Sequence, residues 1–338
     1  MKKITSLLPG ILITIVLAVV SQYCAGFIPN DLISAGVFAM LIGMIIHPLV
    51  SKLDTSKYGI QFVSKTILKA AIVLMGAKFS FSQVLTVGKY SLIVMTFTLI
   101  TAFGCGNLLG KLFKINWKLS NLISAGTGIC GGSAIAAIAP TIEADDNDIA
   151  YAISATFLFD IIMVVLFPIA GRFFGMSDMG YGLWTGTAVN DTSAVVAAGY
   201  AFSDAAGNYA TIVKLTRTLS IVPIVLIFSY VNQVIKAKSS GMNSGRVHVN
   251  LKKIFPWFIL LFLGFVALRS IGIISVSTGN YASDISKFAM VMALGAIGLK
   301  TDFKKVAKSG FLPVVHGFIV SVLVVSVSFL VQLLLHQI

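Results

Sequence analysis

The feature that most constrains this chain is a succession of apolar segments, each long enough to cross a lipid bilayer as a helix. A helix needs about 20 residues to span about 30 Å of hydrocarbon, and we find about eleven segments of that kind. They lie near residues 7–28, 32–50, 60–79, 90–110, 119–140, 149–170, 181–200, 209–234, 254–274, 285–300 and 311–336. Because a backbone in lipid must satisfy its own hydrogen bonds, the sequence predicts an all-α polytopic membrane protein with about eleven transmembrane helices.

Composition excludes a water-soluble domain and a nucleic-acid-binding protein. Of the 338 residues, 57% are hydrophobic and 11% are charged, and the mean hydropathy is +0.96. The formal net charge of +13 comes from basic residues that stand between apolar segments, where they orient a protein in a membrane. The three cysteines have no metal-ligand spacing. We therefore expect the lipid bilayer as surroundings, no nucleic acid as partner, and neither a cofactor nor a metal.

Basic residues in the connections predict the orientation, because they stay on the cytoplasmic side. With a cytoplasmic N-terminus, eleven crossings place most of these residues inside, Arg172 among them. The acidic segment 143–148 and the C-terminus then lie outside, and the polar segment near 236–253 is a cytoplasmic linker.

Two internal similarities suggest repeats within a single transmembrane domain of residues 1–338. Residues 65–88 align with residues 287–310 without gaps, seven crossings apart, which predicts an inverted repeat with halves near 32–170 and 181–336. A shift of 60 residues places the segment that begins at Gly126 on the segment that begins at Gly186. As full crossings these two segments are parallel, so either one is re-entrant or the likeness reflects shared small-residue composition.

The segment GTGICGGSAIAAIAP, which begins at Gly126, gathers glycines where a transmembrane helix carries large apolar residues. Glycine weakens a helix by up to about 1 kcal/mol relative to alanine, so the segment favours a broken helix. The amides freed at such a break form an anion site. A second polar segment lies around Asn190, so we predict two broken helices that meet near the midplane; close helix packing is the alternative.

Charged residues deep in apolar segments are functional candidates, because burying them in lipid is costly. Asp160 and Asp191 are both too deep to reach an interface, and each is a candidate for coupling to H⁺ or Na⁺. A structural ion pair is the alternative for Asp160. Lys69 and Arg217 are the deep cations, and we expect them to neutralise an anion; Lys214 lies near a segment end, where snorkelling is the alternative.

The segments GTGICGGSAIAAIAP, GTAVNDTSAVVAAG and IVKLTRTLSIVPIVLI resemble the signature segments of the bacterial YeiH-type family, labelled sulfate exporters. The resemblance implies a secondary transporter of the bacterial plasma membrane, with an architecture similar to that of bile-acid/sodium symporters. The resemblance also implies that many relatives carry a His-Glu pair where this chain has Asn190 and Asp191. An acid is retained but the histidine is absent, which weakens the case for proton coupling through this pair and leaves sodium coupling open.

We therefore expect an ion-coupled secondary transporter of a small anion, of the sulfate, sulfonate or carboxylate class, and not an enzyme. A passive anion channel and an intramembrane aspartyl protease that uses Asp160 and Asp191 are the alternatives, and a homo-oligomer is compatible with the sequence. The expected substrate-binding residues are Lys69, Thr127, Cys130, Gly131, Gly132, Ser133, Thr187, Asn190, Thr192, Ser193, Lys214 and Arg217.

Overall fold

The structure is a computed structural model that describes residues 6–26, 35–240, 255–301 and 310–337. The described residues form helices and no strand. In chain order the helices are α2 (Leu8–Ala25), α3 (Ala35–Val50), α4 (Asp54–Phe62), η2 (Val63–Ile67), α5 (Leu68–Met75), η3 (Gly76–Lys78), α6 (Phe81–Leu112), α7 (Trp117–Ala125), η4 (Gly126–Cys130), α8 (Gly132–Ile142), α9 (Asp146–Phe173), α10 (Asp178–Ala188), α11 (Thr192–Phe202), α12 (Asp204–Leu219), α13 (Ile221–Ser240), α15 (Trp257–Ser270), α16 (Val276–Lys300) and α18 (Phe311–Leu334).

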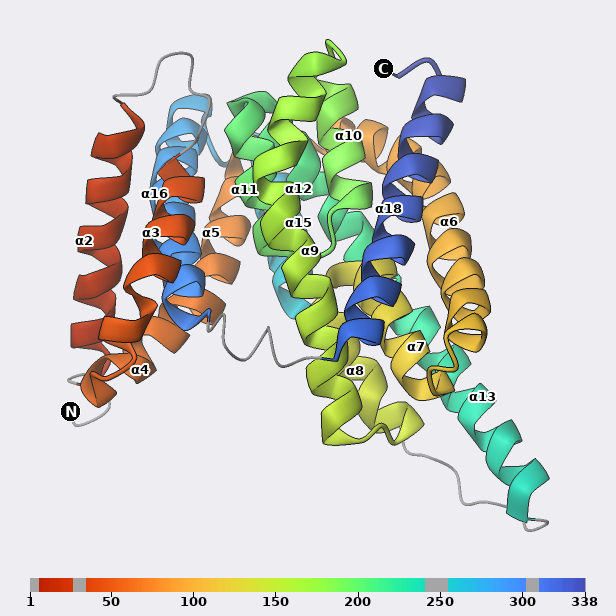
Figure 1. The fold of residues 1–338 in the computed structure, drawn as a ribbon. Helices are drawn as coiled ribbons and strands as arrows, with labels where there is room; N and C mark the ends of the chain where they lie inside the picture. Colours follow the sequence, from red (N-terminus) through yellow and green to blue (C-terminus); the bar gives the residue numbers. More distant parts are fainter. Residues whose placement is uncertain (1–5, 27–34, 241–254, 302–309, 338) are drawn as a thin grey trace.

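The predicted all-helical membrane fold is confirmed. Among the described residues, 7 helices are long and apolar enough to cross a membrane, and α3, α8, α11 and α15 are shorter apolar helices. The start of α2 and the end of α18 lie on opposite faces of the molecule (Figure 1). Helix α13 continues to Ser240, and residues 241–253 of the expected linker lie outside the described residues, as do residues 302–309 of the first internal similarity.

The first glycine-rich segment folds back on itself instead of crossing. Its turn is at Gly131, whose φ of 65° and ψ of −136° are readily adopted only by glycine. The Lys118 side chain near the start of α7 donates a hydrogen bond of 2.6 Å to the carbonyl of Glu143, which directly follows α8. Because its two ends are bonded to each other, the segment α7–η4–α8 is a hairpin, which we call hairpin 1.

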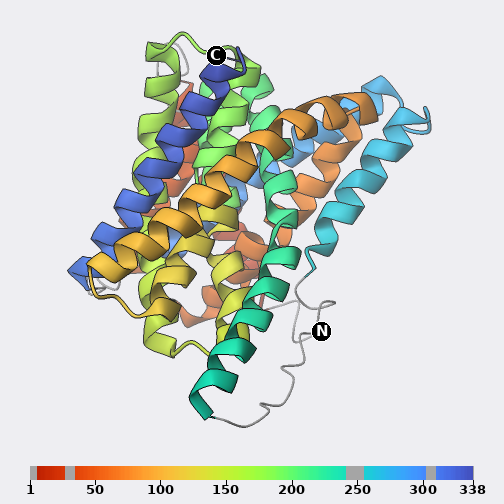
Figure 2. The same ribbon diagram turned by 90° about the vertical axis from the view of Figure 1, so that its right-hand side faces the viewer.

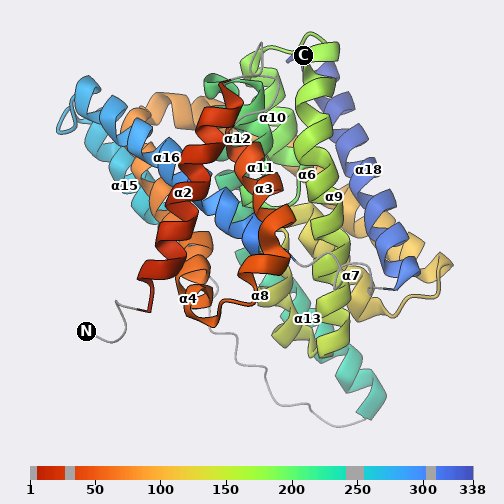
Figure 3. The ribbon, with the colours of Figure 1, turned by 60° about the vertical axis from the view of Figure 1, so that its left-hand side comes forward.

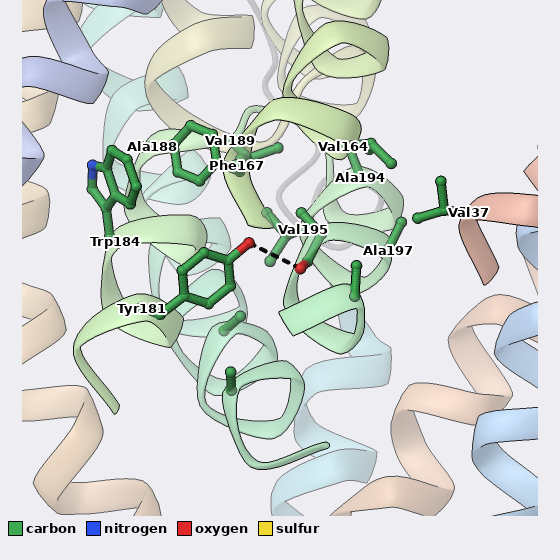
Figure 4. Close-up of a cluster of buried hydrophobic side chains, with 14 of the residues drawn as sticks. Val37, Val164, Phe167, Tyr181, Trp184, Ala188, Val189, Ala194, Val195 and Ala197 are labelled. Carbon is green, nitrogen blue, oxygen red and sulfur yellow. Dashed lines mark hydrogen bonds between the residues drawn. The ribbon is translucent and has the colours of Figure 1, made fainter. Parts of the chain in front are cut away.

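The segment α10–α11 forms a second hairpin, hairpin 2, with its turn at Val189, Asn190 and Asp191. Near its open end the Tyr181 hydroxyl of α10 donates to the carbonyl of Ala198 in α11 at 3.0 Å (Figure 4). Figures 1 and 2 show hairpin 1 in the half of the molecule that holds the start of α2, and hairpin 2 in the half that holds the end of α18. The two hairpins therefore enter from opposite faces, and their tips meet at the middle.

Two details of the predicted topology are therefore wrong. The segments near 119–140 and 181–200 are broken, as predicted, but they return to the face from which they enter. Consequently the acidic segment 143–148 shares a face with the start of α2, and Arg172 lies on the opposite face, the reverse of the expected arrangement. Because α9 alone crosses between the hairpins, the two segments of the 60-residue similarity enter from opposite faces, and both are re-entrant, where the sequence left open only that one of them is.

The helices form two bundles that flank a cleft. The first bundle contains α2, α3, α4, α5, α15 and α16, and the second contains hairpins 1 and 2 with α6, α9, α12, α13 and α18 (Figure 3). Close glycine contacts hold the first bundle together: a Cβ on Gly298 of α16 would lie only 2.1 Å from the carbonyl oxygen of Met40 in α3. Helix α12 packs along both arms of hairpin 2 and carries its side chains to the place where the hairpin tips meet.

Candidate functional site

The site is the junction of the two hairpin tips. Each tip presents the carbonyl end of its first helix and the amide end of its second, because a break in a helix frees both kinds of group. The two tips touch: a Cβ on Gly131 of hairpin 1 would lie 3.1 Å from the Asp191 side chain of hairpin 2. Two carbonyl ends and two amide ends therefore meet within a small volume, and the backbone groups at each end need a hydrogen-bond partner.

Two cations of α12 occupy the carbonyl ends of both hairpins. The Lys214 ammonium donates to the carbonyls of Ile129 at 2.9 Å and Val189 at 3.0 Å, and so joins the two tips. The Arg217 guanidinium donates to Gly128 at 2.6 Å, to Val189 at 3.3 Å, and also to Thr127. Both side chains are fully buried. Cations at the negative end of a helix dipole are stabilising, so these two residues hold the broken segments in place.

This arrangement differs from the role expected for Arg217 and Lys214. We expected them to contact the substrate, but their donors are directed to backbone carbonyls, and neither residue lines the cleft. The sequence correctly indicated a deep cation with a partner, but it could not show that the partner is the main chain.

Asp160 of α9 occupies the amide end of hairpin 2. One of its carboxylate oxygens accepts from the N–H of Asn190 at 2.8 Å, and the other accepts from the N–H of Asp191 at 3.0 Å. Asp160 is buried. It has no ion pair within 4.0 Å in the part of the chain that the structure describes, so the expected alternative of a salt bridge is replaced by two backbone amides.

Asp191 has one oxygen engaged and one oxygen free. Oδ1 accepts from the backbone N–H of Ser193 at 2.9 Å and from the Ser193 hydroxyl, so it caps α11. Oδ2 has no hydrogen-bond partner among the described residues, and it lies 3.1 Å from the position of a Cβ on Gly131. The carboxylate therefore faces the amide end of hairpin 1.

The amide end of hairpin 1 is the one end without a protein partner in the described part of the chain. The first two residues of α8, Gly132 and Ser133, donate no backbone hydrogen bond to another described residue, and the Ser133 hydroxyl has no partner there either. Both residues line the cleft between the two bundles. Positive partial charge and free N–H donors at such an end are suited to an anion.

The cleft has a volume of about 1660 Å³. Its lining includes residues at helix ends on the face that holds the start of α2 (Figure 1). Residues at that face line its mouth, including Ser51 after α3, Thr141 of α8 and Thr301 after α16. Lys69 lies on the wall opposite the hairpins, with its ammonium 5.7 Å from the centre of the Phe258 ring. The predicted site residues that line the cleft are Lys69, Cys130, Gly132, Ser133, Asp160, Asp191, Thr192 and Ser193.

The other predicted residues lie behind the tips. Asn190 is fully buried; its side-chain NH₂ donates to the Thr156 carbonyl and the Ser321 hydroxyl, both at 3.4 Å, while its Oδ1 has no partner among the described residues. Thr127 contacts the same Ser321 hydroxyl at 3.3 Å, and Thr187 contacts the Ser328 hydroxyl at 2.6 Å. Sequence reasoning missed both serines of α18, although their spacing of seven residues places them on one helix face.

On the opposite face the bundles are in contact. Val37 of α3 lies beside Ala197 of α11 in an apolar cluster (Figure 4). The hydroxyl of Tyr200 in α11 is 2.9 Å from the Met75 sulfur of α5, and Lys287 of α16 forms an ion pair with Asp204 of α12. The cleft is therefore open toward one face and closed toward the other.

Fold and site together define an integral membrane protein built around two opposed re-entrant helical hairpins. A family model described as "Conserved hypothetical protein 698" matches residues 9–317. The chain is 67% identical over 336 residues to a UPF0324 membrane protein of Clostridium tetani, with 97% of each chain covered. It is 40% identical to UPF0324 membrane proteins of Streptococcus pneumoniae and Streptococcus mutans, with 92% and 97% of each chain covered. The chain therefore belongs to this family, and the resemblance stated from its signature segments is confirmed.

Proposed function

We propose that the protein is a secondary active transporter of a small anion, which binds at the amide end of hairpin 1. The observation that carries this proposal is the pairing of the four helix ends. Lys214 and Arg217 occupy both carbonyl ends, Asp160 occupies one amide end, and the amide end at Gly132 and Ser133 faces the cleft without a partner among the described residues.

The charges of the cleft support an anionic substrate. Lys57, Lys65, Lys69 and Lys300 line it, and Asp160 and Asp191 are its carboxylates among the described residues. A cleft with a cationic lining concentrates anions. Backbone N–H groups and a hydroxyl at a helix N-terminus bind oxyanions such as sulfate, sulfonate or carboxylate.

Two alternatives are less well supported by the arrangement. An anion channel needs a path open to both faces, whereas the bundles are in contact on the face of hairpin 2. An aspartyl protease needs two carboxyls that share a proton, whereas both oxygens of Asp160 accept backbone amides. A cleft that is open on one side between two bundles favours alternating access.

Removing a single backbone N–H tests the proposed anion site. Proline is tolerated at the first position of a helix, so Gly132→Pro removes the Gly132 N–H and leaves α8 intact. Gly132→Ala is the matched control, because its Cβ meets nothing within 4 Å and the N–H remains. In thermal-shift titrations with sulfate, methanesulfonate and succinate, we expect the proline variant to weaken the apparent affinity of the stabilising anion by about 10-fold or more. Equal affinities of the two variants would contradict the proposed site.

One-sided access of the site is also testable. In a Cys130→Ala background, we expect the thiol of Ser133→Cys to react with a membrane-impermeant maleimide that is added on the face of the α2 start, because Ser133 lines the open cleft. The same reagent added on the other face should label at least about 10-fold more slowly in the absence of an anion. Equal labelling from both faces would favour the channel.

A further inference from the structure

The carbonyl ends of broken helices are where transporters of this general design bind a coupling Na⁺, because unwound carbonyls and helix C-terminal ends supply its oxygen ligands. Here the freed carbonyls of Thr127, Gly128, Ile129 and Val189 accept hydrogen bonds from Lys214 and Arg217. The side chains of Lys214 and Arg217 therefore occupy the position that a coupling cation would take, and as parts of the protein they cannot leave it.

We propose that transport is independent of sodium and is coupled to a proton carried by Asp191 Oδ2. This inference rests on the proposed function, because it concerns the same site. A sodium ion would lack carbonyl ligands that are already engaged, and two resident positive charges would repel it at short range. The need for positive charge at the carbonyl ends is permanently met, so a mobile cation is needed only where a carboxylate oxygen remains without a partner.

Among the described residues of the junction, that oxygen is Oδ2 of Asp191. It lacks a hydrogen-bond partner among the described residues and lies beside Gly131, directly before the free amides of Gly132 and Ser133. An ionised Oδ2 would repel an anion bound to those amides. A proton on Oδ2 removes the repulsion and supplies an O–H that donates to the anion. The anion and the proton therefore bind together on one face and leave together on the other. The proton passes from hydronium in the cleft to Oδ2 on the first face and from Oδ2 back to water on the second, and no other covalent bond changes.

Asp160 is not equivalent to Asp191, because both of its oxygens already accept amides, and a proton there would cost one of these bonds. Among the described residues, the titratable groups that interact electrostatically with Asp191 are Asp160 of α9, Cys130 of η4 and Lys214 of α12. The other such groups that line the same cleft are His47, Lys57, Lys65, Lys69 and Lys300.

Proton movement in proteoliposomes tests this inference without knowledge of the natural substrate. Full-length protein is reconstituted with pyranine inside, and gradients of sulfate, methanesulfonate or succinate are imposed in sodium buffer or in N-methyl-D-glucamine buffer. We expect an anion-dependent acidification of the lumen whose initial rate differs less than about 2-fold between the two cations. We expect Asp191→Asn to reduce anion-dependent proton movement at least about 10-fold.

The outcomes separate the two proposals. Anion flux that falls about 10-fold without sodium, or flux that moves no protons in the wild type, overturns the inference and leaves the transporter in place. Absence of anion flux under every condition overturns the proposed function, and the inference with it. The wild-type comparison needs no variant, so it decides the sodium question even if Asp191→Asn does not fold. A gain of sodium-dependent thermal stabilisation in Lys214→Gln would add direct support, since that variant frees the carbonyls of Ile129 and Val189.

Discussion

Replacing Arg217 by methionine is expected to destabilise the folded protein by about 3–5 kcal/mol. The guanidinium donates to carbonyls in both hairpins, and methionine leaves these buried oxygens without a partner. The loss is measurable as a change in the free energy of unfolding in detergent micelles titrated with SDS. We expect Arg217→Lys to recover only part of the stability, because an ammonium lacks the planar fork that reaches several carbonyls.

Thr216→Ala is a matched control for the Arg217 variant. The Thr216 hydroxyl donates only within α12, to the carbonyl of Ile212 at 3.0 Å, so its removal should change the free energy of unfolding by less than about 1 kcal/mol. If Arg217→Met were as stable as Thr216→Ala, the guanidinium would not be holding the hairpin tips, and the description of the junction would be wrong.

Replacing Gly131 by alanine is expected to cost about 1–3 kcal/mol of stability and to weaken anion binding about 10-fold. The φ of 65° is strained for any residue with a Cβ, and that Cβ would press against the Asp191 side chain at 3.1 Å. The turn would shift, and with it the free amides of α8. Thermal unfolding and anion titration measure the two effects.

The neighbouring glycine supplies the comparison. Gly132 has helical geometry and open space around its Cβ position, so Gly132→Ala should be close to wild type in both measurements. Equal behaviour of the Gly131 and Gly132 variants would mean that the left-handed turn of hairpin 1 is not required.

Much of the helical fold could be predicted from the sequence because lipid leaves few choices to a polytopic chain. Apolar segments of sufficient length must be helices, and the glycines from Gly126 to Gly132 indicate where one of them breaks. The fold-back could not be predicted, because a segment of about 25 residues is long enough either to cross the bilayer or to enter and return. That choice depends on the backbone angles at Gly131 and on contacts such as that of Lys118 with Glu143.

The candidate site was predicted in composition but not in connectivity. The depth of Asp160, Asp191 and Arg217 indicated that each has a function, since a charge in lipid requires a partner. Their partners are mainly backbone groups, which every residue carries, and sequence gives no signal for them. Because sequence does not reveal backbone partners, Arg217 was expected to contact an anion, whereas its guanidinium donates to backbone carbonyls of the two hairpins.

The most direct test of the account is to locate an anion in crystals of the protein soaked in selenate or bromide. Anomalous scattering should give a peak within hydrogen-bond distance of the N–H groups of Gly132 and Ser133, and that peak should be absent from Gly132→Pro crystals. A peak on the Arg217 or Lys214 side chain, or peaks on surface lysines alone, would contradict the assignment of the amide end of hairpin 1 as the anion site.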